Sequence, residues 1–187
     1  MNLTSRQISP TMHKQLFKTL GILWISAFLT WGCSSAGTAH DYTVNDLQFE
    51  LAGPLFEGPN QGQYVLEIDL ATALGDAYEE GMSVSDARLK SATVLAGDSL
   101  GFSQVRSFVL SFASDNAEVA MQEAAFKNPL PDGATEVALE VAPDAELGAI
   151  VAEGTLYLVL DADLAEDYYD GNRNFKLNLS LELTVKS

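Results

Sequence analysis

The segment FKLNLSLELTVK, residues 175–186, decides the fold class of this chain because it alternates without interruption. Its odd-numbered residues are apolar, and its even-numbered residues are polar or charged. Successive side chains of a strand point to opposite faces, whereas a helix repeats every 3.6 residues. A helix would scatter these apolar side chains around its surface. The pattern therefore predicts a long strand with one buried face.

The same period of two recurs upstream, between clusters of turn-forming residues. Ser114-Asp115-Asn116 predicts a turn after one such strand, and Val119 with Met121 then predicts a returning strand, so that 108–121 forms a hairpin. Residues 143–153 are the one expected helical turn, with Pro143 near its start. Asp161-Ala162-Asp163 is expected to end the last strand but one. The other expected strands cover residues 42–51, 64–70, 84–94, 108–112, 137–141 and 156–160.

About eight strands with almost no helix predict an all-β protein. The expected architecture is a two-sheet antiparallel β-sandwich, with strands in either a jelly-roll or an immunoglobulin-like order. Residues 42–187 are enough for one domain and not comfortably enough for two. The sequence therefore predicts a single β-sandwich domain over 42–187.

The first 32 residues have the composition of a secretory signal peptide. Arg6, Lys14 and Lys18 precede an apolar run, LGILWISAFLTW, over residues 20–31, and no acidic residue lies among them. A helix needs roughly 20 apolar residues to span a bilayer, and this run is shorter. We therefore expect residues 1–32 to be cleaved. Met12 offers an alternative start with a more ordinary basic segment, MHKQLFKTL.

The sequence LTWGC, residues 29–33, resembles the lipobox of bacterial lipoproteins, and Cys33 is the only cysteine. The resemblance implies that Cys33 becomes the acylated N-terminus and that residues 33–41 form the lipidated cysteine and a tether. It also implies a lipid-anchored protein of the cell envelope. Ser34 after the cysteine resembles an outer-membrane sorting signal, facing the periplasm or the cell surface. The alternative is an ordinary signal peptide cut nearby.

The order of turns and strands in the body loosely resembles that of uncharacterised β-sandwich lipoproteins of Gram-negative bacteria. The pattern includes the segment SDARLKSATVLAGD over 85–98, the loop NPLPDG over 128–133 and the long final strand. This resemblance rests on the pattern of turns and strands and not on a motif. It implies no activity.

The chain is strongly acidic, with 10 Lys and Arg against 26 Asp and Glu and a net charge of −16. Loss of residues 1–32 removes three of the ten cations and no acid, which leaves −19. Such a surface disfavours nucleic acid, which is bound by neutralising phosphates, and anionic lipid surfaces. It is typical of a solubilising surface or of a cation-binding one.

The residue types that remain after cleavage also exclude several chemistries. His40 is the one histidine left, and there is no cysteine besides Cys33. A tetrahedral zinc site, a Ser-His-Asp triad and a Cys-His pair are therefore out of reach. A hydrolase built on paired carboxylates is the least favoured alternative. We expect a protein that is not an enzyme.

The densest group of oxygen donors lies in the acidic segment 161–174. Calcium takes six to eight oxygen ligands, often from Asp and Asn in a loop turned by glycine. The segment lacks the order of an EF-hand. A solvated loop whose Asn and Asp residues support a turn is the alternative. The candidate calcium ligands are Asp161, Asp163, Asp167, Asp170 and Asn172.

Tyr168 and Tyr169 lie in the same loop and are candidate ligand-binding residues, because exposed aromatic rings stack on sugars. One of the two is expected to pack against the rim of the sandwich. The sequence thus favours a lipid-anchored interaction or accessory domain, with an envelope protein or a glycan as its partner. A calcium-dependent or glycan-binding module is the alternative.

Overall fold

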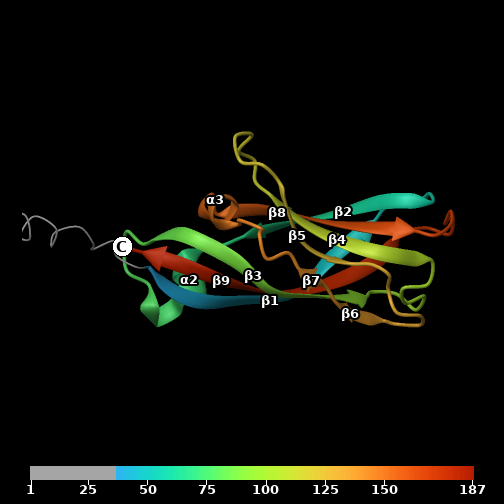
Figure 1. The fold of residues 1–187 in the computed structure, drawn as a ribbon, viewed down its shortest axis with the longest axis horizontal. Helices are drawn as coiled ribbons and strands as arrows, with labels where there is room; N and C mark the ends of the chain where they lie inside the picture. The colour runs from blue at the N-terminus through green and yellow to red at the C-terminus, as the bar shows by residue number, and fades with distance from the viewer. Residues whose placement is uncertain (1–36) are drawn as a thin grey trace, which may run out of the picture. The chain divides into compact units, whose positions relative to one another are not determined.

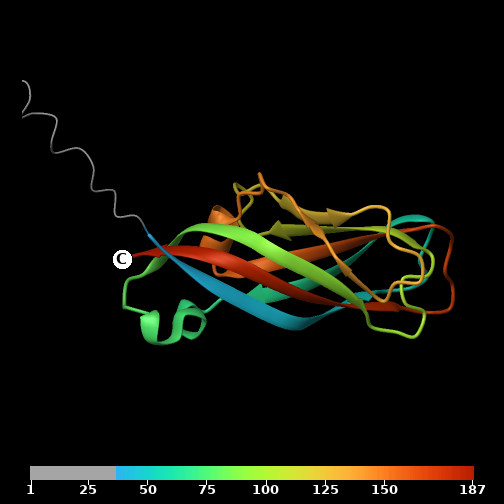
Figure 2. The same cartoon turned by 60° about the horizontal axis from the view of Figure 1, so that its bottom comes forward.

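A computed structural model of the chain describes residues 37–187, which fold into two stacked antiparallel sheets (Figures 1 and 2). The predicted all-β sandwich is confirmed. Predictions for the signal peptide and for Cys33 lie outside the described residues. The strands are β1 Thr38–Leu51, β2 Gly58–Glu67, β3 Ser83–Ala96, β4 Val105–Ala113, β5 Gln122–Lys127, β6 Glu136–Ala138, β7 Glu140–Val141, β8 Thr155–Leu164 and β9 Arg173–Lys186; the short helices are α2 Leu70–Leu74, the 3-10 helix η1 Gly75–Ala77, and α3 Gly148–Ala152.

The strand order is that of a jelly roll. One sheet has the order β1-β9-β3-β6 and the other β2-β8-β4-β5-β7. With the two-residue β7 set aside, the first strand pairs with the last, β2 with β8, β3 with β6, and β4 with β5. This is one long hairpin rolled into two facing sheets, the jelly-roll arrangement. Of the two predicted orders, the immunoglobulin-like one is therefore excluded.

Strand β9 is central to its sheet, as its alternating sequence predicts. It pairs with β1 on one side and with β3 on the other. Its odd-numbered residues from Arg173 to Val185 are buried, and its even-numbered residues from Asn174 to Thr184 are half-buried. The buried face of β9 contributes to one hydrophobic core between the two sheets. Ten paired residues also join β2 to β8, so both sheets are built on long ladders.

Several strand boundaries differ from the sequence prediction. Strand β2 covers 58–67 instead of 64–70, and the predicted strand 137–141 is divided between β6 and β7, which belong to different sheets. Strand β1 begins at Thr38, so residues 38–41 of the predicted tether are paired with β9, and His40 lies opposite Leu183. Strand β8 continues through Asp161-Ala162-Asp163 to Leu164, where a turn is predicted. Ala162 and Leu164 are buried and the two aspartates face outward. Two aspartates close together are typical of a turn in composition, although here they lie on the outer face of a strand.

The connections differ more than the strands. The returning strand of the hairpin is β5, from Gln122, and not residues 119–121. Helix α3 covers only the last part of the predicted turn 143–153. Helix α2 is not predicted at all; Asp69 caps it by accepting from Ala71 N at 3.1 Å and from the Thr72 hydroxyl at 2.7 Å. These hydrogen bonds lower the pKa of Asp69.

The sandwich has two distinct ends, which can be followed in Figure 1. At the terminal end, Thr38 pairs with Val185, and α2, η1 and α3 lie nearby. At the opposite loop end, the connections 52–57, 97–104, 128–135 and 165–172 join the strands. None of the helices within residues 37–187 is both long enough and apolar enough to cross a membrane.

Candidate functional site

The loop end brings together connections that are far apart in the sequence. Loops 52–57, 97–104 and 165–172 each cross from one sheet to the other. Because β1, β9 and β3 are neighbours in one sheet and β2, β8 and β4 in the other, these three crossings lie side by side. The loops are neighbours because of the order of the strands in the two sheets, and not because of the amino-acid sequences of the loops themselves.

Arg173, the first residue of β9, ties loop 97–104 to the base of loop 165–172. Its side chain is fully buried, with a relative exposure of 0%. Its Nε donates to Asp98 Oδ2 at 3.1 Å, Nη1 to the Ser103 carbonyl at 3.2 Å and Nη2 to the Gly101 carbonyl at 2.7 Å. A buried charge is tolerated only when it is paired and hydrogen-bonded, and Arg173 meets that requirement.

The guanidinium of Arg173 also lies against aromatic rings. Its Cζ is 5.5 Å from the ring centroid of Tyr168 and 5.5 Å from that of Phe175. Such distances allow a cation–π attraction, which is larger in a desolvated site than on the surface. Tyr168 is half-buried and packs against the core. Arg173 therefore holds loop 165–172 against the core through its contact with Tyr168.

Loop 52–57 is fastened to loop 165–172 by backbone and side-chain hydrogen bonds. Leu55 N donates to the Tyr168 carbonyl and Tyr168 N to the Leu55 carbonyl, both at 2.9 Å. Gly53 N donates to Asn172 Oδ1 at 3.0 Å. A side chain at Gly53 would overlap the carbonyl of Gly171, so the close approach of the two loops requires glycine there. The two loops form one continuous surface.

Asp167 connects the backbone of loop 52–57 to the exposed side chain of Tyr169. Its Oδ1 accepts from Glu57 N at 2.8 Å and its Oδ2 from the Tyr169 hydroxyl at 2.7 Å. The hydrogen bond from Tyr169 and then that from Glu57 lower the pKa of Asp167. The same hydrogen bond to Asp167 raises the pKa of Tyr169. Tyr169 is thus oriented although its ring is exposed.

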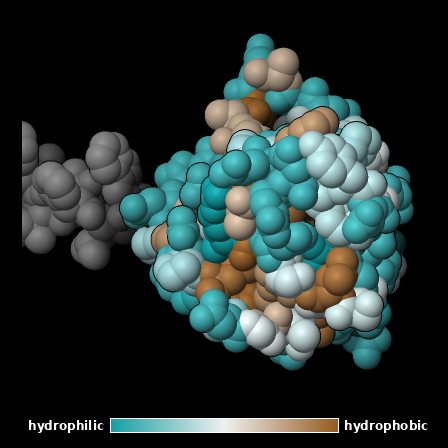
Figure 3. Space-filling view, turned by 90° about the vertical axis from the view of Figure 1, so that its right-hand side faces the viewer, coloured by the Kyte–Doolittle hydropathy of each residue, from teal (hydrophilic) through white to brown (hydrophobic). Residues whose placement is uncertain are grey.

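Phe56 and Tyr169 form an exposed aromatic pair, which we call the aromatic corner. Their exposures are 56% and 66%, their ring centroids are 6.3 Å apart, and their planes meet at 85°. Leu100, on the neighbouring loop 97–104, is 44% exposed. Figure 3 shows hydrophobic residues on this end in patches that lie among hydrophilic ones. Exposed apolar groups with a polar rim are typical of binding surfaces.

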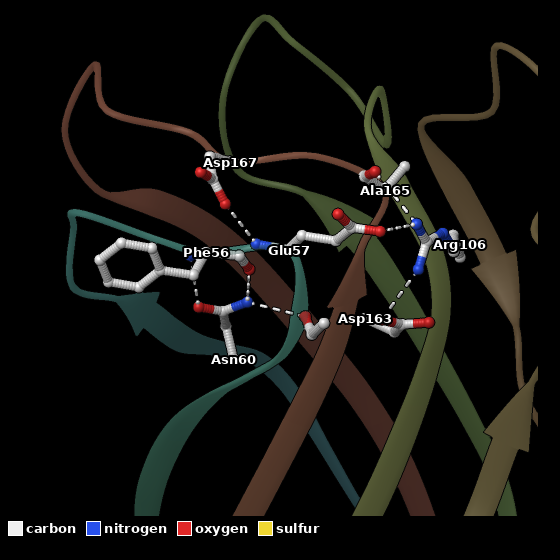
Figure 4. Close-up of polar contacts among 8 residues, drawn as sticks. Phe56, Glu57, Asn60, Arg106, Asp163, Ala165 and Asp167 are labelled. Carbon is white, nitrogen blue, oxygen red and sulfur yellow. Dashed lines mark hydrogen bonds and ion pairs between the residues drawn. The ribbon is translucent and has the colours of Figure 1, made fainter.

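Arg106 supports the corner from β4 (Figure 4). Its Nη2 lies 2.7 Å from Glu57 Oε1 and 3.0 Å from the Ala165 carbonyl, and its Nη1 lies 3.7 Å from Asp163 Oδ1. Asn60 Nδ2 donates to the Phe56 carbonyl at 2.7 Å. The Phe56 ring points away from this cluster, toward solvent. The polar contacts hold the backbone of Phe56 and leave its ring available.

The predicted calcium ligands are not gathered into one site. Asp161 accepts from Gln61 at 3.0 Å, and the contacts of Asp163, Asp167 and Asn172 described above are each with a different protein group. Asp170 is exposed in the loop. Among residues 37–187, no group of three or more Asp, Glu, His or Cys side chains could hold a metal ion. Calcium binding by this segment stays a prediction.

Of the two predicted ligand-binding tyrosines, Tyr169 is exposed and Tyr168 packs against the rim. Phe56 and Arg173 are not among the residues predicted from the sequence. Phe56 follows a Gly-Pro-Leu turn and could have been noticed as an aromatic residue between strands. Arg173 has no such signal, because it stands at the polar start of β9 and continues the odd-numbered buried face.

A groove of about 780 Å³ lies at the terminal end, alongside β3, the segment 118–122 and the segment 143–149. It is open and largely polar. Asp86, Glu118, Asp144 and Glu146 contribute carboxylates to it, and Arg88 contributes one cation, which is paired with Asp86 at 3.4 Å. The groove provides a second acidic surface with which the loop end can be compared.

No protein family and no characterised protein matches the sequence. The solved structures to which the chain shows similarity include three viral capsid chains. A chain of the Triatoma virus empty capsid is 12% identical with a TM-score of 0.36, covering 77% of this chain and 88% of its own. A chain of Triatoma virus is 9% identical with a TM-score of 0.35, and the match covers 100% of this chain and 78% of the viral one. A chain of Cocksfoot mottle virus is 11% identical with a TM-score of 0.28, and the match covers 97% of this chain and 96% of the viral one. We transfer no function from these similarities.

Proposed function

We propose that this chain is a lipid-anchored protein of the cell envelope, in which the β-sandwich is a non-catalytic binding domain and the loop end is its binding surface. The anchor is the acylated Cys33 of the lipobox-like sequence. The envelope compartment is the outer membrane, facing the periplasm or the cell surface. The partner is an envelope protein.

The observation that carries the proposal is the aromatic corner on a rigid frame. Two large rings are more than half exposed, although burial of each would be favourable. The backbone around them is nevertheless held by the hydrogen bond that Asp167 accepts from Glu57 N, the one that Asn60 donates to Phe56, and the Leu55–Tyr168 bridge. Rings that are ordered before binding lose less entropy when a partner covers them. This combination is what a preorganised binding surface requires.

The position of the corner suits an anchored protein. Thr38 begins β1 at the terminal end, five residues after Cys33. An extended chain spans at most about 3.5 Å per residue, so the link reaches no more than roughly 18 Å. The 14 residues of β1 extend over roughly 45 Å at about 3.3 Å each. An acyl anchor on Cys33 would therefore hold the terminal end near the bilayer and present the loop end away from it.

The chemistry of the loop end favours binding over catalysis. It has no histidine or cysteine. Its carboxylates at positions 57, 163 and 167 are each engaged with Arg106 or with loop hydrogen bonds. A glycan partner is the second candidate, since the exposed rings of Phe56 and Tyr169 suit stacking on sugars.

Acylation of Cys33 is tested with the full chain expressed in a Gram-negative host fed labelled palmitate. We expect label on the mature protein and its recovery in the membrane fraction. Cys33→Ser should lose both, and Ser34→Ala, the matched neighbour, should keep both. Unlabelled, soluble mature protein from the unchanged sequence would refute the anchor.

The binding surface is tested by placing a photo-crosslinking amino acid at Tyr169 in living cells. A defined adduct is expected at position 169 and not at Val65, which is 49% exposed on β2 away from the loops. Phe56→Ser should weaken the adduct. Equal crosslinking at both positions, or none at Tyr169, would show that the loop end is not the binding surface.

A further inference from the structure

We propose that the aromatic corner binds an arginine or lysine side chain on a basic segment of the partner protein. This inference rests on the proposed function and deepens it, because it names the chemistry that the loop end recognises. Its basis is the geometry of Phe56 and Tyr169 together with the charge of the loop that carries Tyr169.

The geometry provides ring surface for a cation. The two ring planes meet at 85° with their centroids 6.3 Å apart, and both residues are more than half exposed, so a cation can approach the rings from solvent. A guanidinium or ammonium group within about 6 Å of a ring face is attracted by the negative face of the ring. Arg173 already makes this contact below the surface, on Tyr168 at 5.5 Å.

The charge around the corner selects a cation over an anion. Loop 165–172 carries Glu166, Asp167 and Asp170 and no basic residue. Arg106 and Arg173, the arginines next to the loops, are already paired with carboxylates. A basic partner segment therefore gains attraction from unneutralised carboxylates, whereas an acidic segment is repelled.

The orientation of Tyr169 makes the corner specific. Its hydroxyl donates to Asp167, which also accepts from the backbone of Glu57. This hydrogen bond restrains the phenol ring of Tyr169 in its position beside Phe56. An arriving cation meets a formed corner, so the binding energy is not consumed in ordering the rings.

The test measures binding of fluorescein-labelled peptides to the full chain in detergent micelles by fluorescence anisotropy. The probes are a Gly-Ser peptide with three spaced arginines, the same peptide with citrulline, which keeps the shape and loses the charge, and the same peptide with glutamate. We expect binding of the arginine peptide alone, weakened when salt rises from about 50 to 300 mM.

The variants locate the site. Phe56→Leu and Tyr169→Leu keep an apolar side chain and remove a ring, and each should weaken binding about two- to fivefold, the range of an exposed cation–π contact. Asp170→Asn should weaken binding, whereas Asp144→Asn, the same change in the acidic groove of the terminal end, should leave it unchanged. Tyr169→Phe keeps the ring and should bind better than Tyr169→Leu.

Three results would overturn the inference: equal binding of the citrulline peptide, unchanged binding by both leucine variants, or an equal effect of Asp144→Asn and Asp170→Asn. An equal effect of the two Asn variants would show that the arginine peptide binds through the net negative charge of the chain and not at the aromatic corner. These results are separable from failure of the proposed function. If position 169 crosslinks in cells but the arginine peptide does not bind, the loop end is still the binding surface and only the proposal of a basic partner segment is wrong.

Discussion

At the terminal end of the sandwich, short helices cover the core with apolar side chains, whereas the loop end combines apolar side chains such as Leu55 and Phe102 with a fully buried arginine. Leu74 of α2 and Ile150 and Val151 of α3 are buried and have no polar atoms to satisfy. Arg173 has three hydrogen bonds, and each must be met by a particular atom of loop 97–104.

The difference shows how each end specifies its geometry. Apolar packing tolerates substitution as long as volume is kept, so it sets position only loosely. A buried polar network is stable only when every partner is in place, so it fixes one arrangement of its loops. The loop end can therefore keep Phe56 and Tyr169 exposed and still ordered.

Arg173→Met should be the most damaging change. It keeps most of the side-chain volume but leaves the Gly101 and Ser103 carbonyls without donors and Asp98 without its ion pair. Breaking a buried pair costs about 3 kcal/mol at the lower end of the usual range. That corresponds to a fall in Tm of roughly 6–12 °C for a domain of this size. The fall in Tm is measured by thermal melts of the full chain in detergent. A fall of less than 2 °C would show that the network is not what closes this end.

Ile150→Ala should be nearly as destabilising at the terminal end. The side chain is completely buried, and removing it creates a cavity that costs about 2–3 kcal/mol. Its effect should stay local. Hydrogen exchange is expected to increase in α3 and β3, which α3 packs against, and not in loop 165–172. Faster exchange in that loop would show that the two ends are coupled.

The Asp167–Tyr169 hydrogen bond should give the loop end a pH window. The pKa of Asp167 is lowered from its ordinary 3.8, so the stability from this contact is present above about pH 4 and lost as pH falls through the lowered pKa. The pKa of Tyr169 is raised from its ordinary 10.0, so on the alkaline side the contact is present up to about pH 10 and lost as pH rises through the raised pKa. The difference in melting between the unchanged chain and Tyr169→Phe should vanish outside the window. A difference that is constant from pH 3 to pH 11 would contradict this assignment.

Phe56→Ser should hardly change stability, within about 0.5 kcal/mol, because its ring is mostly exposed and the backbone hydrogen bonds to Asn60 remain. The same change should reduce crosslinking at Tyr169 in cells. Denaturant melts and crosslinking on one preparation make the comparison. A large loss of stability would mean that the ring serves the fold and not a partner.

Calcium should have the smallest effect. A bound ion at 100 times its Kd would add about 2.7 kcal/mol and raise Tm by roughly 5–10 °C. Here Asp163 and Asp167 would first have to leave Arg106 and Glu57 N, so we expect a smaller shift between EDTA and millimolar calcium at matched ionic strength. A shift of the full size, abolished by Asp170→Ala and not reproduced by magnesium, would establish a metal site in 161–174.

The sequence predicts the strands well and the connections poorly, for a physical reason. The alternation in 175–185 is local and is preserved in β9. Asp161 and Asp163 look like a turn because composition does not reveal that Ala162 between them is buried. Helix α2 is only five residues long and depends on the Asp69 cap, so it has no helical period to detect.

The candidate site is predictable only in part. Tyr168 and Tyr169 are found from the sequence, because aromatic residues in a polar loop are conspicuous. Which of them is exposed depends on Arg173 and Leu55, which hold Tyr168 against the rim. Phe56 reaches Tyr169 only because β1 lies beside β9 and β2 beside β8.

Residue types and their local pattern were enough to predict the all-β class, the acidic composition and the absence of cysteine from residues 42–187. Each of these depends on residue type or on neighbours in the chain. Only the tertiary structure decided that Glu57 and Asp167, 110 residues apart, share a hydrogen bond, that Arg173 is buried, and that Phe56 and Tyr169 meet. The physical reason is that a strand pattern specifies which face is buried, whereas the pairing order of strands specifies which loops become neighbours.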